Sequence, residues 1–260
     1  MIGTHEIKEI ARKNGIPSTT IERDYVQNFL LKSLYSKTDA LVFKGGTAIR
    51  KAFVQDYRFS DDLDFTLSKH VNREEMAALF AGIINDISEE GIIFEEGVEF
   101  KAVATGWKIK MHHTSGLSKN TRIKMFLDIT NPNLELVITP VEHHQLIHNY
   151  SDVCKAKLIT YSLSEITAEK LRALCDRGWP RDLYDVNNLW PQIEKLGIQE
   201  LFSRKCRIRG LEPTLDKYKQ NKERIRSAWS KSLEHQLKVV PDFNETFQGV
   251  LTILESLNVV

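Results

Sequence analysis

The 260-residue sequence has only three cysteines, Cys154, Cys175 and Cys206, and they are widely spaced. Their odd number and the lack of a Cys-x-x-Cys pair argue against a disulfide framework and favour three buried thiols in a reducing, cytoplasmic protein. No apolar run reaches membrane-spanning length, and the polar N-terminus has no secretory core, so we expect no membrane partner. The net charge is only +1, so any basic surface for nucleic acid has to be local.

The spacing of apolar residues differs between the two halves of the chain. Period-two alternation between residues 92 and 138 predicts several strands of one mixed or antiparallel sheet, with helices before it. From about residue 160 onward the apolar spacing is helical. The sequence therefore predicts an α/β (α+β) fold, with a mixed sheet and flanking helices in residues 1–150 and a helical domain in residues 151–260.

Residues 44–65, KGGTAIRKAFVQDYRFSDDLDF, combine a pair of glycines with an Asp-Leu-Asp sequence. Side chains two apart in a strand share a face, with Cα atoms roughly 6–7 Å apart, so Asp62 and Asp64 should lie together while Leu63 and Phe65 face the core. Two carboxylates held so close need a cation, and Mg²⁺ or Mn²⁺ takes carboxylate and phosphate oxygens. The pair predicts a divalent metal site.

The adjacent glycines fit the same chemistry. Without Cβ atoms at Gly45 and Gly46, backbone N–H groups can approach a phosphate closely, and Thr47 adds a hydroxyl. Three nearby cations are candidates to neutralise polyphosphate charge: Arg50, Lys51 and Arg58. A tight turn beside a solvated strand is the alternative interpretation, and it would suffice for Asp-x-Asp alone. The two features together favour a phosphate and metal site.

This stretch resembles the first motif of nucleotidyltransferases related to DNA polymerase beta, and more narrowly the AbiEii/AbiGii-type toxin family, which includes the MenT toxins. That family has a Gly-Gly-Thr turn, a basic helix and then Arg-Phe-Ser-x-Asp-hydrophobic-Asp. Eight residues match the pattern here: Gly45, Gly46, Thr47, Arg58, Phe59, Ser60, Asp62 and Asp64. The resemblance implies that the two aspartates hold Mg²⁺ or Mn²⁺ and catalyse transfer. It also implies that the glycines, Thr47, Arg58 and Ser60 bind an NTP.

A second block, EKLRALCDRGWPRDLYDVNNL at residues 169–189, resembles the later motifs of the same family, a lysine helix followed by Arg-Asp-x-x-Asp-hydrophobic. The matching residues are Glu169, Lys170, Arg177, Arg181, Asp182 and Asp185. The resemblance implies catalytic roles for Lys170, Asp182 and Asp185 and nucleotide binding by Arg177 and Arg181. Without the family, a solvated salt-bridge network on a helical hairpin is the default interpretation.

Other features allow two interpretations each. Asp128 is a candidate third metal ligand or proton acceptor, but it also fits a strand-end residue capping the turn at Asn131. His144 and His148 have zinc-like spacing, although there is no HExxH motif and no obvious third ligand. The basic runs at 203–210 and 217–226 fit either solvated helix faces or a groove for an RNA backbone.

Through both motifs, the resemblance implies that the chain is the toxin of a bacterial toxin–antitoxin or abortive-infection system. The resemblance implies transfer of a nucleoside monophosphate from an NTP to an RNA hydroxyl, with tRNA modification at the 3′ end as the expected reaction. The helical domain is expected to complete the active-site cleft, and a cognate antitoxin is the expected protein partner. Two alternatives stay open: a protein or small-molecule acceptor, and a non-catalytic nucleotide-binding effector.

Overall fold

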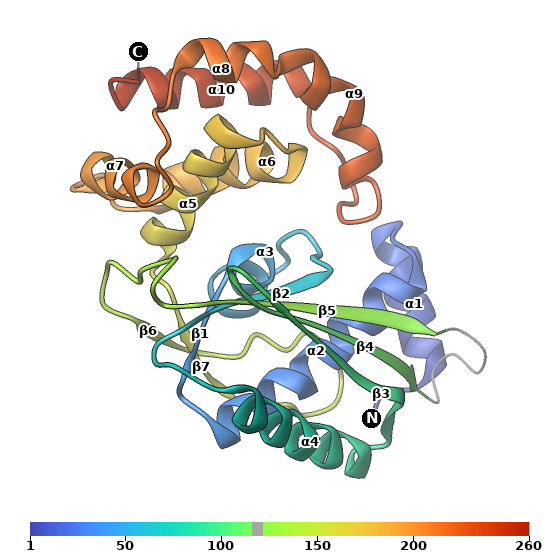
Figure 1. The fold of residues 1–260 in the computed structure, drawn as a ribbon. Helices are drawn as coiled ribbons and strands as arrows, with labels where there is room; N and C mark the ends of the chain where they lie inside the picture. Colours follow the sequence, from blue (N-terminus) through green and yellow to red (C-terminus); the bar gives the residue numbers. More distant parts are fainter. Residues whose placement is uncertain (116–121, 260) are drawn as a thin grey trace. The chain divides into compact units, whose positions relative to one another are not determined.

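The computed structural model describes residues 1–115 and 122–259. The N-terminal part of the chain forms a mixed seven-stranded sheet with its helices (Figure 1). The chain forms two packing units, Met1–Tyr161 and Ser162–Val260. Residues 151–161 belong to the first unit because β7 (Lys157–Thr160) pairs in parallel with β1 (Leu41–Lys44). The unit boundary therefore lies later than the expected position after residue 150.

The sheet has the strand order β3-β4-β5-β2-β1-β7-β6. Strand β2 runs antiparallel to β1 and parallel to β5, so the sheet is mixed, as the sequence predicts. The remaining strands are β2 (Asp62–Leu67), β3 (Ile92–Val103), β4 (Gly106–Ser115), β5 (Ile123–Thr130) and β6 (Glu142–Gln145). The helices of this unit are α1 (Thr4–Asn14), α2 (Ser18–Lys37), α3 (Gly45–Ala48), which continues as a π-turn over Ile49–Phe53, and α4 (Arg73–Glu89).

Helices α2 and α4 pack against one another and against the sheet, α4 on β3 and α2 on β5 and β7, while α3 packs against β2 and β1 (Figure 1). The alternation predicted for β2 is confirmed, because Leu63 and Phe65 are fully buried whereas Asp62 and Asp64 are half-buried. Phe65 stacks on Phe43 of β1 with ring centroids 5.0 Å apart. Burial of each such side chain stabilises the fold by about 1.5–3 kcal/mol. Hydrophobic burial on one face thus fixes which way the aspartates point.

Arg50 and Lys51 do not lie where the sequence analysis placed them. Both are buried, and both meet Asp24 of α2: Arg50 Nε donates to Oδ1 at 2.7 Å, and Lys51 Nζ lies 2.9 Å from the same atom. The Tyr150 hydroxyl donates to the other carboxylate oxygen at 2.7 Å. Both cations already pair with Asp24 inside the protein, so the prediction that they neutralise a polyphosphate is wrong. They anchor the π-turn to α2 instead.

Burial shapes the ionisation of this cluster. Burial alone would raise the pKa of Asp24, but Arg50 and Lys51 outweigh it and hold that pKa well below the usual 3.8. Burial also lowers the pKa of Lys51 to about 8, against the attraction of Asp24. The Asp24 carboxylate therefore offsets part of the cost of burying the charged side chains of Arg50 and Lys51.

Asp24→Asn is expected to lower the free energy of unfolding by about 3–5 kcal/mol at pH 7, because it leaves Arg50 and Lys51 buried without a counter-charge. The folded-state pKa of Asp24 is depressed, so its contribution is present above pH 3.8 and is lost as the pH falls below that value. Urea titrations should therefore show a smaller difference between variant and wild type at pH 3 than at pH 7. Asp39→Asn, whose side chain is 80% exposed, is the control. Equal stabilities at pH 7 would contradict the account.

The second unit is helical over its described residues, as the apolar spacing predicts. Its helices are α5 (Leu163–Asp176), α6 (Pro180–Leu189), α7 (Ile198–Ile208), α8 (Leu215–Gln220), α9 (Lys222–Leu233) and α10 (Phe243–Ser256). Helix α5 ends just before Gly178, whose φ of 54° is left-handed and terminates the helix. Lys205, from the basic run at 203–210, is 2% exposed and lies 2.6 Å from Glu165 and 2.9 Å from Glu169. This lysine joins α7 to α5 and does not present its charge to an RNA.

Cys154, Cys175 and Cys206 are buried and form no disulfide, and burial raises the pKa of each thiol, that of Cys175 to about 12. They are inert core residues, as expected. Over residues 1–115 and 122–259, no helix has both the length and the apolar character that crossing a bilayer requires.

Candidate functional site

The turn from β1 into α3 brings the two glycines against the acidic strand. Gly45 has a φ of 78°, in the left-handed region that favours glycine. A Cβ atom at Gly45 would overlap Oδ2 of Asp64 and lie 3.1 Å from its Cβ and Cγ. Thr47 is fully buried, and its hydroxyl donates to the backbone carbonyl of Asp62. The glycine turn and the carboxylate pair are therefore one contiguous structure within the first unit.

The Arg-Phe-Ser segment closes on the other side of the turn. A Cβ atom at Gly46 would lie 2.5 Å from Nη2 of Arg58 and 3.1 Å from Oγ of Ser60. Arg58 is 2% exposed, and its Nη1 donates to the carbonyl of Phe59 at 3.1 Å. The Ser60 carbonyl accepts a hydrogen bond from Gln27 of α2 at 3.1 Å. The missing side chain at Gly46 thus admits a guanidinium and a hydroxyl beside the turn.

Strand register adds charged side chains to the face that carries the aspartates. Asp64 lies opposite Asp128 of β5 and opposite Lys44 of β1. Asp128 is inside β5 and its carboxylate lies 3.1 Å from Lys108 Nζ, so it does not cap the turn at Asn131. Lys44 is buried, like its ion-pair partner Glu135.

Sequence reasoning missed Lys44 and Glu135. They are 91 residues apart, and neither stands in a local pattern that predicts a buried ion pair. The position of Lys44 directly before Gly45 was the only available signal.

The donor set suits a hard divalent cation. Over residues 1–115 and 122–259, no three His, Cys, Asp or Glu side chains are grouped closely enough to hold a metal alone. Mg²⁺ characteristically uses one or two carboxylates and completes its shell with waters and substrate phosphates. Asp62 and Asp64 supply such a pair, on one face of one strand and against the bare turn at Gly45. These residues therefore fit the ion.

The helical unit holds the second motif in a buried cluster. Lys170 Nζ of α5 lies 2.8 Å from Asp182 Oδ1 and 3.0 Å from Asp185 Oδ2, both on α6. The carboxylates are 2% and 0% exposed, and Lys170 is 13% exposed. Arg177 Nη2 lies 3.2 Å from the second oxygen of Asp182. The solvated salt-bridge interpretation is therefore wrong for this hairpin.

Nearby cations keep Asp182 ionised. Burial alone would raise the pKa of Asp182, but Lys170 and Arg177 outweigh it, so the pKa lies below 3.8. Arg177 remains 45% exposed and stacks on Trp179, with its Cζ 3.8 Å from the ring centroid. Arg181 is half-buried on the first turn of α6. Trp179 is exposed beside these arginines and was not singled out from the sequence.

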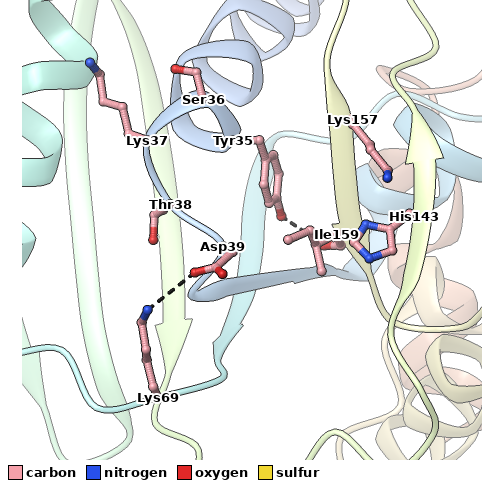
Figure 2. Close-up of a pocket in the computed structure, with 9 residues that line it drawn as sticks. All are labelled: Tyr35, Ser36, Lys37, Thr38, Asp39, Lys69, His143, Lys157 and Ile159. Atoms are coloured by element: carbon pink, nitrogen blue, oxygen red, sulfur yellow. Dashed lines mark hydrogen bonds and ion pairs between the residues drawn. The ribbon is translucent and has the colours of Figure 1, made fainter.

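A separate cavity of about 470 Å³ opens elsewhere in the first unit (Figure 2). Its lining residues are Tyr35, Ser36, Lys37, Thr38, Asp39, Lys69, His143, Lys157 and Ile159. None of them was predicted as a site residue. Lys69 pairs with Asp39 at 3.4 Å, and Lys37 pairs with Asp86 at 2.9 Å. The glycine turn, not this cavity, combines carboxylates with a bare backbone.

Comparison with known proteins identifies a family and similar folds. A family model described as the nucleotidyl transferase AbiEii toxin of a type IV toxin–antitoxin system matches residues 28–253. The fold is similar to that of MenT4, a nucleotidyltransferase toxin from Mycobacterium tuberculosis H37Rv, with a TM-score of 0.69 and 19% identity over 100% of this chain and 91% of that one. It is also similar to a candidate nucleotidyltransferase from H. pylori, with a TM-score of 0.63 and 17% identity over 93% and 96% of the two chains. No curated protein sequence matches the chain.

Proposed function

The chain belongs to the AbiEii family of nucleotidyl transferase toxins of type IV toxin–antitoxin systems, and we propose that it transfers a nucleoside monophosphate from an NTP to an RNA hydroxyl at the 3′ end of a tRNA. The family implies an NTP substrate and a cognate antitoxin. The contact between the Gly45 turn and the Asp62–Asp64 pair carries the proposal, since it joins a place for phosphate to a place for a metal.

In the proposed reaction, the acceptor hydroxyl oxygen attacks the α-phosphorus of the NTP. A new oxygen–phosphorus bond forms while the bond to the bridging oxygen breaks, and pyrophosphate leaves. Asp62 and Asp64 would hold Mg²⁺ or Mn²⁺, which neutralises phosphate charge as the leaving group departs. Asp128, one strand away from Asp64, takes the proton of the attacking hydroxyl.

The triphosphate is proposed to bind at the bare turn. Backbone N–H groups at Gly46 and Thr47 contact its oxygens, while Arg58 and Ser60 approach from the facing segment. The Thr47 hydroxyl already donates to the Asp62 carbonyl, so Thr47 contributes its backbone to the phosphate and its side chain to the position of the metal strand. This narrows the role that the family motif implies for Thr47.

We assign the buried hairpin of the helical unit to the same reaction because it carries the second family motif, at residues 169–189. Lys170 contacts phosphate charge, and Asp182 and Asp185 orient its ammonium from two directions. Arg177 and Arg181 contact the nucleotide. Trp179 stacks on Arg177 and restricts the guanidinium to one plane, which favours bidentate contact with a phosphate.

Purified protein given each α-³²P-labelled NTP with total RNA is expected to label RNA in the tRNA size range and to release pyrophosphate. EDTA should abolish both signals, and added Mg²⁺ or Mn²⁺ should restore them. Label that enters protein in place of RNA would refute the acceptor. NTP binding with no pyrophosphate release under any acceptor would refute catalysis.

A further inference from the structure

An exposed phenylalanine lies on the sheet face that carries the candidate metal ligands. Phe126 of β5 is 43% exposed, whereas its neighbours Met125 and Leu127 are 1% and 0% exposed. The parallel pairing of β2 and β5 sets Phe126 directly opposite Asp62. Opposed residues of adjacent strands share a face and lie about 5 Å apart, so the ring is a direct neighbour of the acidic pair. It is also two residues from Asp128 on the same strand.

Lysines lie beside this ring on its own strand and on the side away from β2. The register sets Lys110 of β4 opposite Phe126 and Lys108 opposite Asp128. Lys101 of β3 lies opposite Lys108, and Lys124 precedes Phe126 by two residues on the same face. We call Phe126 and these four lysines, at positions 101, 108, 110 and 124, the lysine face.

Carboxylates accompany these lysines on the same sheet face, namely Asp62, Asp64, Asp128 and Glu99. Lys110 is paired with Glu99 at 2.8 Å and Lys108 with Asp128 at 3.1 Å, while Lys101 and Lys124 are exposed. The chain as a whole carries a net charge of only +1, so the cluster of lysines is a local feature. A group of lysines such as this attracts the successive phosphate groups of a nucleic-acid backbone.

A single exposed apolar side chain is ordinary on a protein surface and needs no function. The position of Phe126 separates it from that case, because it has lysines on one side and, on the other, the carboxylates that are proposed to hold the metal. An aromatic ring among cations is the arrangement that binds single-stranded nucleic acid, since every base can stack and every phosphate can pair. A protein acceptor would need a run of acidic side chains to meet these lysines, whereas every nucleotide of a nucleic acid supplies a phosphate.

We propose that the lysine face binds the single-stranded end of the nucleic-acid acceptor, with a base stacked on Phe126 and the adjoining phosphates on the lysines. This inference rests on the proposed function, and it specifies that the acceptor presents its single-stranded end to the site. The stacked base lies beside Asp62, so the terminal hydroxyl next to it is held near the reacting phosphorus. Selection for an unpaired end follows, because a base inside a duplex cannot offer its face to the ring.

The test measures binding directly, with a fluorescein-labelled single-stranded oligoribonucleotide that has a free 3′ hydroxyl, by anisotropy and without NTP. Phe126→Ala is expected to raise the Kd roughly 10-fold, the size of one lost base–aromatic stack, and Phe126→Trp should restore it. Lys124→Ala should lower the slope of log K against log salt by about 0.7, as for one lost phosphate contact. Val153→Ala and Lys8→Ala, both exposed and outside the lysine face, are the matched controls.

Each outcome decides for or against the inference. Wild-type protein that does not bind the oligonucleotide, or that prefers a blunt duplex or an acidic protein, overturns it. Equal Kd values for wild type and Phe126→Ala overturn it as well, even if RNA is labelled. Oligonucleotide binding that depends on Phe126 without any label transfer supports the lysine face and defeats the proposed catalysis, so the two failures are distinguishable.

Discussion

Asp62→Asn is expected to reduce nucleotide transfer by about 10³-fold or more. The substitution keeps the shape of the side chain but removes one of the two charges that are proposed to hold the metal, which is worth several kcal/mol at the transition state. The Thr47 hydroxyl meets the backbone carbonyl of residue 62, which the substitution does not alter. The substitution also removes the repulsion between two like charges on one face, so we expect no destabilisation. The free energy of unfolding should stay within about 1 kcal/mol of wild type.

Initial rates of label incorporation at saturating NTP, together with a urea titration, measure both quantities. Asp39→Asn is the matched control, because Asp39 is an exposed carboxylate whose ion pair with Lys69 is on the surface. Wild-type rates in the Asp62 variant would remove that residue from the catalytic site. A variant that is inactive because it is unfolded would be recognised by its urea midpoint.

Gly45→Ala is expected to abolish transfer and to destabilise the fold. A methyl group at this position would overlap Oδ2 of Asp64, so either the turn or the carboxylate has to move. The left-handed backbone adds a cost of about 1–2 kcal/mol for any L side chain. The loss of activity should therefore exceed what the conformational strain alone explains.

Gly197 provides a control for that strain. Its φ is also 78°, but a Cβ atom there would meet nothing within 4 Å. Gly197→Ala should have the conformational cost alone, seen as a modest fall in the urea midpoint with transfer near wild type. Similar activities in the two alanine variants would show that the contact between Gly45 and Asp64 is unimportant for the reaction.

Local pattern was sufficient for the face of the acidic strand and for the helical nature of the second unit. Burial of Leu63 and Phe65 follows directly from alternation, and it determines where Asp62 and Asp64 point. The helix end before Gly178 follows from the glycine itself. In both cases the decisive interaction lies within a few residues of the signal.

The cations could not be placed in this way, because their partners are distant in sequence. Arg50 was predicted to face a phosphate, but the carboxylate it meets belongs to α2, 26 residues earlier. Lys205 meets Glu169 across 36 residues. Spacing along one helix indicates which side chains share a face, but it does not indicate which charge the fold brings to that face.

The unit boundary was placed too early for a similar reason. Strand β7 is only four residues long, and it belongs to the first unit because it pairs with β1, more than a hundred residues earlier in the chain. A short strand carries little periodicity of its own. Its pairing partner, not its composition, assigns Lys157–Thr160 to the sheet.

The most direct test of the account is the binding of Mn²⁺, measured by electron paramagnetic resonance with and without a non-hydrolysable NTP analogue. If the acidic pair and the glycine turn form one metal–triphosphate site, the analogue should increase Mn²⁺ affinity in wild type and in Gly197→Ala. The same increase should be absent in Asp62→Asn and Gly45→Ala. Analogue-dependent Mn²⁺ binding of wild-type strength in Asp62→Asn would contradict the account.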